Sequence, residues 1–197
     1  MASAGACACA CGDRGVNATA FVVVLLGAES TGKTTLAREL ASTLEARGER
    51  VVRVDEYLRE FCAARGRTPQ RDEQAGIAAE QTTRIDAATA TAGIVVADTS
   101  ALMIAVYSEL VFGDTSLYAS ALAAHRRARL TLLTALDLPW RDDGFQRDGP
   151  HVRAPVDALI RASLAGAGIA CATIDGQGRE RTKSALRAID AARKPAA

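Results

Sequence analysis

The chain has 197 residues, which is enough for one domain with a sizeable core and short for two. Hydrophobic residues make up 49% of it and charged residues 24%, as is typical of a soluble globular domain. With 24 Lys and Arg residues against 23 Asp and Glu residues, the net charge is +1, so no basic excess indicates a nucleic-acid partner. No apolar run approaches the roughly 20 residues of a membrane-spanning helix, so we expect no membrane partner.

Three of the five cysteines lie near the N-terminus, in the motif A-C-A-C-A-C-G. Their C-x-C-x-C spacing differs from the usual C-x₂-C of zinc sites, and a soft-metal or redox role is the alternative to a plain flexible tail. Residues 1–18 are small and polar without periodicity, so we expect a flexible leader there and a folded domain over residues 19–193. Nothing else indicates a disulfide scaffold, and we expect reduced thiols and a cytoplasmic protein.

Apolar runs that suit buried strands alternate along the chain with segments of helical periodicity. The run A-F-V-V-V-L-L-G at 20–27 is apolar throughout, as in a strand covered on both faces. In the segment that follows, Leu36, Leu40 and Leu44 recur every four residues on one helical face. We expect further strands at 51–54, 93–98, 129–136 and 169–174, and helices at 33–47, 56–66, 73–92, 100–111, 116–127, 154–165 and 178–192.

This alternation predicts an α/β domain with a parallel sheet of about five strands and helices on both faces. In such sheets, ligands bind in the crevice at the carboxyl ends of the strands. The chemically interesting residues of this chain follow strand ends, at Gly27, Glu56, Asp98 and the loop 137–151. We therefore expect one binding site at that edge.

The segment G-A-E-S-T-G-K-T-T matches the phosphate-binding P-loop pattern G-x-x-x-x-G-K-[ST], between a strand and a helix as the motif requires. Its glycines let backbone N–H groups approach phosphates, and the helix N-terminus adds free N–H groups and a positive dipole end. Lys33 would neutralise the β and γ phosphates, and the Thr34 hydroxyl would ligate Mg²⁺. The predicted nucleotide-binding residues are Gly27, Ala28, Glu29, Ser30, Thr31, Gly32, Lys33, Thr34 and Thr35.

Carboxylates after the second and third strands are candidates for metal binding and catalysis. Asp98 ends the strand V-V-A-D and would hold Mg²⁺ or substrate, the alternative being a helix cap. Asp55 or Glu56 would accept the proton of an attacking hydroxyl group, as phosphoryl transfer requires. The alternative is a helix start with an i,i+3 ion pair between Glu56 and Arg59.

The loop 137–151 has the composition of a lid over a phosphate site. Arg141, Arg147 and Arg153 could reach a transferring phosphoryl group. Glycines within the loop would let it close, whereas the alternative is a solvated loop. Trp140 and Phe145 favour the lid, because large aromatic side chains usually cover something.

Other polar and aromatic residues carry weaker expectations. Four aromatic residues could stack on a base but are by default core residues: Tyr57, Tyr107, Phe112 and Tyr118. We expect His125 on a helix surface. Gln81 and Arg84 share one helix face and would either line a pocket or be solvated.

Four segments, G-A-E-S-T-G-K-T-T-L, E-Y-L-R-E-F, V-V-A-D-T and W-R-D-D-G-F-Q-R, resemble the nicotinamide riboside kinase domain of bacterial NAD-biosynthesis regulators, a group of AAA-like P-loop kinases and ATPases. The resemblance covers roughly residues 20–190. It implies phosphoryl transfer from ATP, with Mg²⁺, to the ribose 5′-hydroxyl of nicotinamide riboside. By position it suggests Lys33 and Thr34 for ATP and Mg²⁺, Glu56 and Asp98 for the reacting hydroxyl and the metal, and Arg147 for the lid. We therefore expect catalysis by Lys33, Glu56, Asp98 and Arg147 and metal binding by Thr34 and Asp98. The expected substrate contacts are Asp55, Glu56, Tyr57, Arg59 and Asp142. The regulators' DNA-binding and adenylyltransferase domains lie outside it.

Two other function classes are compatible with the P-loop. One is a kinase of another nucleoside or nucleotide, which would work by the same mechanism. The other is a P-loop ATPase that acts as a conformational switch and hydrolyses ATP without a small acceptor. A pure nucleotide-binding module would leave the carboxylates idle, and the guanine-specific N-K-x-D element of GTPases is missing from the sequence.

Overall fold

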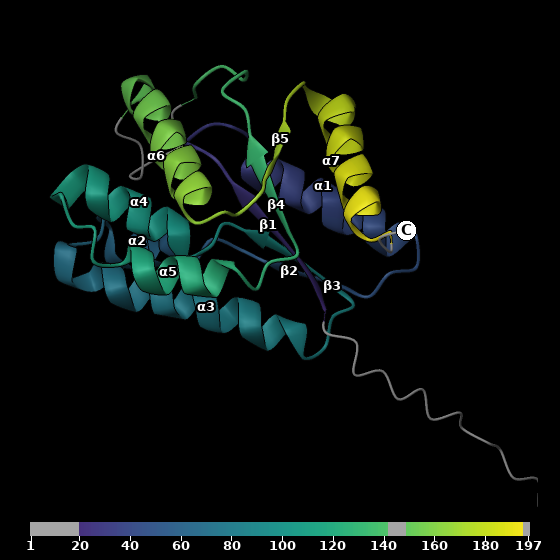
Figure 1. The fold of residues 1–197 in the computed structure, drawn as a ribbon, viewed down its shortest axis with the longest axis horizontal. Coiled ribbons are helices and arrows are strands. Elements are labelled where there is room, and N and C mark those ends of the chain that lie inside the picture. The colour runs from purple at the N-terminus through teal and green to yellow at the C-terminus, as the bar shows by residue number, and fades with distance from the viewer. Residues whose placement is uncertain (1–19, 142–148, 195–197) are drawn as a thin grey trace, which may run out of the picture.

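The computed structural model describes residues 20–141 and 149–194, which form a five-stranded parallel sheet in the order β2-β3-β1-β4-β5 (Figure 1). The strands are β1 (Phe21–Leu26), β2 (Val51–Val54), β3 (Ile94–Asp98), β4 (Leu130–Thr134) and β5 (Ala172–Ile174). The helices are α1 (Lys33–Ala46), α2 (Tyr57–Arg65), α3 (Gln74–Thr89), α4 (Ala101–Phe112), α5 (Tyr118–His125), α6 (Arg153–Gly166) and α7 (Gly178–Ala192). Two short 3₁₀ turns, η1 (Arg71–Glu73) and η2 (Pro150–Val152), precede α3 and α6.

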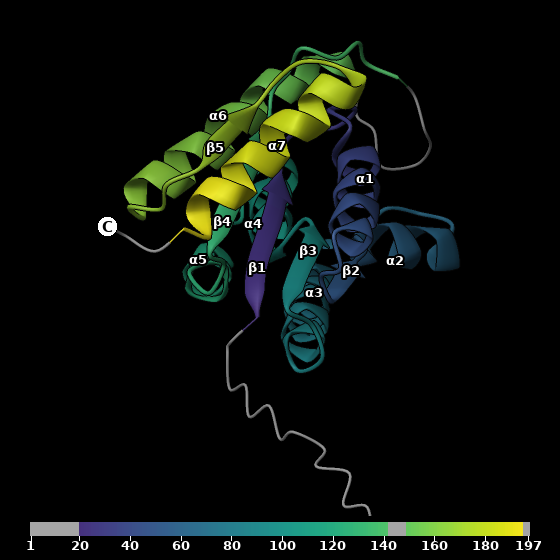
Figure 2. The same cartoon turned by 90° about the vertical axis from the view of Figure 1, so that its right-hand side faces the viewer.

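Alternate side chains of the central strand β1 enter two separate cores, one on each face of the sheet. Val23 and Leu25 pack with Leu36 of α1 and Ile189 of α7. Val24 lies on the opposite face, in the core formed with residues of α4 and α6. Figure 2 shows α1 and α7 on one side of the sheet and α4, α5 and α6 on the other. The expected parallel sheet with helices on both faces is therefore confirmed.

The main departure from the expected elements lies at the sheet edge. β5 pairs with β4 over only three residues, from Ala172 to Ile174, instead of starting at residue 169. Ile169 does not pair with β4, because its N–H donates to the carbonyl of Leu164 and closes the turn after α6. The apolar run thus includes a helix end as well as a strand. Within the described residues, no helix is long and apolar enough to cross a membrane.

The expected surface position of His125 is wrong, since the residue is only 3% exposed. Its Nδ1 lies 2.9 Å from Ser100 Oγ and its Nε2 lies 2.9 Å from Thr131 Oγ1. The end of α5 turns this ring inward against the start of α4 and against β4. Burial lowers the pKa of His125 to about 4, so the ring is neutral at physiological pH.

Candidate active site

The P-loop starts where β1 ends, and two of its glycines have positive φ angles, a conformation that favours glycine. Gly27 has a φ of +149°, and a Cβ there would lie 2.0 Å from Thr134 Oγ1. Gly32 has a φ of +77° and immediately precedes α1. The loop therefore adopts a compact conformation that packs on β4. The Lys33 ammonium group donates to the carbonyl oxygens of Gly27 and Ala28, each at 2.8 Å.

Buried hydrogen bonds from distant parts of the chain fix the loop in place. The Thr31 hydroxyl donates to the Ala28 carbonyl at 2.8 Å and accepts from the Thr134 hydroxyl at 2.7 Å. The guanidinium group of Arg181, on α7, donates to the Thr31 carbonyl at 2.9 Å and to Asp137 Oδ1 at 2.8 Å. Arg181 is 4% exposed, so these bonds are shielded from water. The backbone of the loop is consequently held in one conformation, a preorganisation that would favour phosphate binding.

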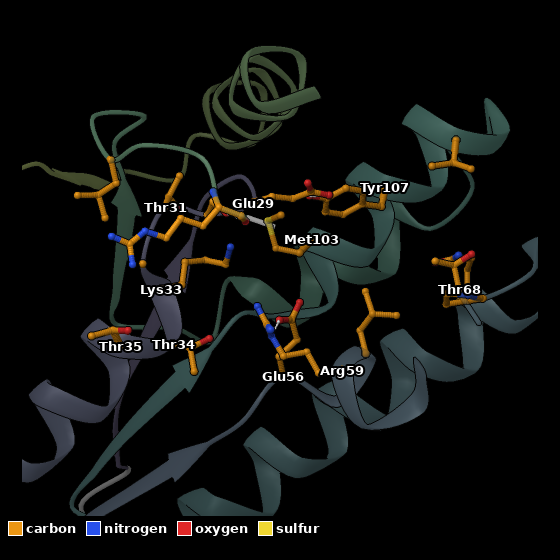
Figure 3. Close-up of a pocket in the computed structure, with 18 of the residues that line it drawn as sticks. Glu29, Thr31, Lys33, Thr34, Thr35, Glu56, Arg59, Thr68, Met103 and Tyr107 are labelled. Carbon is orange, nitrogen blue, oxygen red and sulfur yellow. Dashed lines mark hydrogen bonds and ion pairs between the residues drawn. The ribbon is translucent and has the colours of Figure 1, made fainter. Parts of the chain in front are cut away.

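A cleft of about 700 Å³ opens beside the P-loop (Figure 3). Its phosphate side is formed by residues 29–35 of the loop and the start of α1. Its far side is formed by α4 and by the link between α2 and α3, including Met103, Tyr107, Phe112 and Gln74. The volume lies within the range of small-molecule sites, and the mixed lining suits a phosphate group at one end and an organic group at the other.

The side chains of Glu56 and Arg59 lie in this cleft, on the side opposite Lys33 (Figure 3). Glu56 directly precedes α2, and its Oε2 lies 2.7 Å from Arg59 Nε. The Glu56 side chain is only 12% exposed, whereas that of Arg59 is 40% exposed. The ion pair foreseen as an alternative to catalysis therefore exists, but it lies inside the cleft and holds the Glu56 carboxylate there.

Asp98 is 1% exposed at the end of β3, next to the P-loop strand. Neither of its carboxylate oxygens has a well-formed hydrogen-bond partner among the described residues, although the nearby Thr34 hydroxyl favours the charged form. Burial, and then repulsion from Glu56, raise the pKa of Asp98 despite that hydroxyl, Lys33 and Arg59. The alternative of a helix cap is not what the structure shows, because Ser100 caps α4.

The donor set at Asp98 and Thr34 fits a magnesium ion that arrives with a nucleotide. Mg²⁺ prefers oxygen ligands and commonly keeps several waters and phosphate oxygens around it. A buried carboxylate without a well-formed partner, close to the P-loop hydroxyl, offers two such oxygens. Among residues 20–141 and 149–194, no group of three or more His, Cys, Asp and Glu side chains could hold a metal alone.

Several other predicted site residues lie elsewhere. Asp55 is outside the cleft lining, and its carboxylate pairs with Arg53 at 2.6 Å. Tyr57 is also outside the lining; its ring packs in a core cluster beneath Arg84. Arg153 is buried and donates to the Leu138 carbonyl at 2.9 Å, so it holds the loop instead of reaching the cleft.

The predicted lid is described only in part. Arg141 lines the cleft, and its carbonyl and N–H groups both bond to the hydroxyl of Ser30. Trp140 precedes it with a partly buried ring. Asp142, Arg147 and the rest of 142–148, like the leader 1–18, lie outside the described residues. The lid and the roles of Asp142 and Arg147 therefore stay predictions.

Sequence reasoning missed most of the far wall of the cleft. Tyr107 and Phe112 line it, although both were expected in the core. Tyr107 also donates to the buried carboxylate of Glu29 at 3.3 Å, which joins α4 to the P-loop. Gln74, at the start of α3, is 5% exposed and lines the same wall. Only the aromatic character of Tyr107 and Phe112 gave a signal, and it did not distinguish core from cleft.

The sequence matches the AAA domain family over residues 22–181. The chain belongs to that family. No curated protein sequence matches this AAA domain.

Solved structures share the fold of this AAA domain. A NadR protein in complex with NAD and AMP-PNP has a TM-score of 0.69 at 23% identity, over 88% of this chain and 49% of that one. A NadR protein in complex with NR has a TM-score of 0.70 at 24% identity, over 88% and 50%. Thymidylate kinase from Ehrlichia chaffeensis has a TM-score of 0.62 at 14% identity, over 88% and 98%. The chain spans about half the length of the NadR chains, and likeness at this identity shows the P-loop NTPase fold.

Proposed function

We propose that this AAA domain is an ATP-dependent small-molecule kinase that phosphorylates the ribose 5′-hydroxyl of nicotinamide riboside to give nicotinamide mononucleotide. The observation that carries the proposal is the placement of Glu56 across the cleft from Lys33 and beside Asp98. A carboxylate in that position can accept the proton of an acceptor hydroxyl as it attacks the γ-phosphate. Glu56 is favoured over Asp55 as the base, because the Asp55 carboxylate is paired with Arg53 outside the cleft lining.

The remaining groups have roles that follow from their positions. Lys33 would leave the carbonyl oxygens of its own loop to neutralise the β and γ phosphates, and Mg²⁺ held by Thr34 and Asp98 would offset the charge that develops between them. The P-loop backbone would fix the triphosphate in line with the acceptor hydroxyl, which supplies much of the rate acceleration in this chemistry. Arg147 would complete the charge stabilisation if the lid closes.

The charge balance of the far end of the cleft favours an acceptor without a phosphate group. Three arginines line the cleft: Arg59 pairs with Glu56 at 2.7 Å and Arg71 pairs with Asp114 at 3.3 Å, whereas Arg141 lies on the phosphate side, next to Ser30 of the P-loop. A nucleotide acceptor would call for arginines that are not already matched by carboxylates. Nicotinamide riboside carries no phosphate, so its binding would need no such arginine. The NadR neighbour in complex with NR supports the same acceptor.

Coupled ADP release tests the proposal. The protein is assayed with Mg²⁺–ATP alone, with nicotinamide riboside, and with a panel of other nucleosides and nucleoside monophosphates. We expect ADP release to depend on nicotinamide riboside and to match the nicotinamide mononucleotide formed. ADP release that ignores every acceptor would contradict the proposal and indicate an ATPase that acts as a switch.

A further inference from the structure

Gln81, in the middle of α3, bonds to the peptide groups on both sides of Glu56. Its Oε1 accepts a hydrogen bond from the Tyr57 N–H at 2.8 Å, and its Nε2 donates to the Asp55 carbonyl at 3.3 Å. The residue is only 1% exposed, so water does not compete for either bond. Both hydrogen-bonding ends of one side chain are thus used on the main chain of the strand-to-helix connection that carries Glu56.

The start of α2 lacks a local cap from its own N-cap residue. Glu56 occupies the N-cap position of α2 with an extended backbone, and its own side chain makes no cap hydrogen bond. The first N–H groups of a helix lack partners within the helix, and Tyr57 provides the first of them. Gln81 supplies that partner from a different helix. The starting point of α2, and with it the position of the Glu56 backbone, is therefore set by α3.

A second residue of α3, one turn further along the helix, also contacts the start of α2. The guanidinium group of Arg84 lies 4.4 Å from the centre of the Tyr57 ring, and it pairs with Glu60 of α2 at 2.7 Å. Gln81 itself does not line the cleft, so it can influence the reaction only through the segment it holds. Arg59 orients the carboxylate of Glu56, whereas Gln81 fixes the backbone from which that carboxylate projects.

We propose that Gln81 is a positioning residue for Glu56, an inference that rests on the proposed kinase function. Loss of its two bonds lets the residue 55–57 segment shift, which moves the carboxylate away from the acceptor hydroxyl. A displacement of about 1 Å can cost on the order of 100-fold in rate. The two hydrogen bonds of Gln81 go to residues 55 and 57 and not to the P-loop, Thr34 or Asp98, so we expect ATP binding to be unaffected.

The kinetic test uses Gln81→Met, which keeps the length of the side chain and removes both bonds, and Gln81→Asn, which keeps the amide but is too short to reach both peptide groups. We expect kcat to fall roughly 10- to 100-fold, with the KM for ATP unchanged. Thr82→Val is the matched control, because it removes one hydrogen bond within the same helix and leaves the segment untouched. An unchanged kcat in both Gln81 variants would overturn the inference.

A double-mutant cycle separates positioning from a merely structural role. In a Glu56→Gln background, Gln81→Met should cost little further activity, since the group that it positions is already disabled. If the two losses in kcat multiply in full, Gln81 does not act through Glu56, and the inference fails.

Hydrogen exchange at the Tyr57 amide tests the hydrogen bond to Gln81 directly, without reference to activity. We expect protection in the wild type that disappears in Gln81→Met, because this amide has no acceptor within α2. An unprotected Tyr57 amide in the wild type would overturn the inference. Wild-type protein without acceptor-dependent turnover would instead remove the proposed function, so the two failures are distinguishable.

Discussion

Glu56 and Arg59 form an ion pair of 2.7 Å at the start of α2, and both side chains lie in the cleft opposite Lys33. Ion pairs between residues three apart on a helix are often exposed to solvent and then have little effect on stability. Here it restricts the rotamers of a carboxylate that is 12% exposed and lies near Asp98. The ion pair therefore orients the Glu56 carboxylate within the cleft.

Replacement of Glu56 by Gln should lower kcat by about 100-fold or more while ATP binding is retained, because the amide cannot accept the acceptor proton. Asp55→Asn is the matched control: it removes a neighbouring carboxylate that lies outside the cleft lining. Steady-state kinetics and ATP titrations of both variants provide the measurement. A larger loss with Asp55→Asn than with Glu56→Gln would assign the base to Asp55.

Lys33→Ala should abolish turnover, with a loss of at least about 100-fold in kcat/KM, because the phosphates lose their closest full charge. The fold should survive, since the hydrogen bonds that the ammonium group donates to the carbonyl oxygens of Gly27 and Ala28 lie within its own loop. Circular dichroism and thermal unfolding check the fold. Lys183→Ala, which removes an exposed lysine paired with Glu180, should leave activity unchanged. Wild-type activity in Lys33→Ala would refute the P-loop assignment.

Asp98→Asn should separate function from stability. Burial raises the pKa of Asp98, so above its ordinary value of 3.8 the charged carboxylate costs the folded state stability. A neutral amide removes that cost, and we expect an equal or higher Tm without Mg²⁺. Activity should fall, and the Mg²⁺ concentration for half-maximal rate should rise. A lower Tm together with an unchanged Mg²⁺ requirement would make Asp98 a structural residue.

The buried His125 should make the protein less stable in mild acid. Its folded-state pKa of about 4 lies below the ordinary 6.5, so the unfolded chain binds more protons between these values and stability falls as pH decreases. The expected loss between pH 7 and pH 5 is about 2 kcal/mol. Urea unfolding at both pH values measures it, and His125→Gln should largely remove the difference. The Arg67 guanidinium lowers the pKa of Glu73 from its ordinary 4.5 to about 2. The contribution of that ion pair to stability is therefore lost only below about pH 4.5, outside the range from pH 7 to pH 5. A loss of the same size in His125→Gln would assign the effect to other groups.

Local sequence patterns were sufficient to predict the elements that position the site. Leu36, Leu40 and Leu44 recur at helical spacing, and all three are 2% exposed or less. The P-loop was predictable because its glycines, lysine and threonine are contiguous and follow an apolar strand. β2 and α7 also have the predicted bounds, since Asp55 follows the valine-rich strand directly and the turn at 176–177 precedes the helix.

Features that join distant parts of the chain were not predictable. Arg181 and Thr134 both form hydrogen bonds with Thr31, although they lie 150 and 103 residues from Thr31 in the sequence. A buried arginine or threonine has no periodic signature that distinguishes it from a solvated one on an amphipathic helix or strand. His125 illustrates the same difficulty, because α5 is short and rich in alanine, so its sequence does not show which face is buried.

The fate of the γ-phosphoryl group of ATP tests the central claim most directly. The protein is incubated with Mg²⁺ and ATP labelled at the γ-phosphate, with and without nicotinamide riboside, and the labelled products are separated. We predict that the label appears in the 5′-phosphate of nicotinamide mononucleotide, and that little is released without the acceptor. Label found only in inorganic phosphate, at the same rate with or without the riboside, would contradict the account.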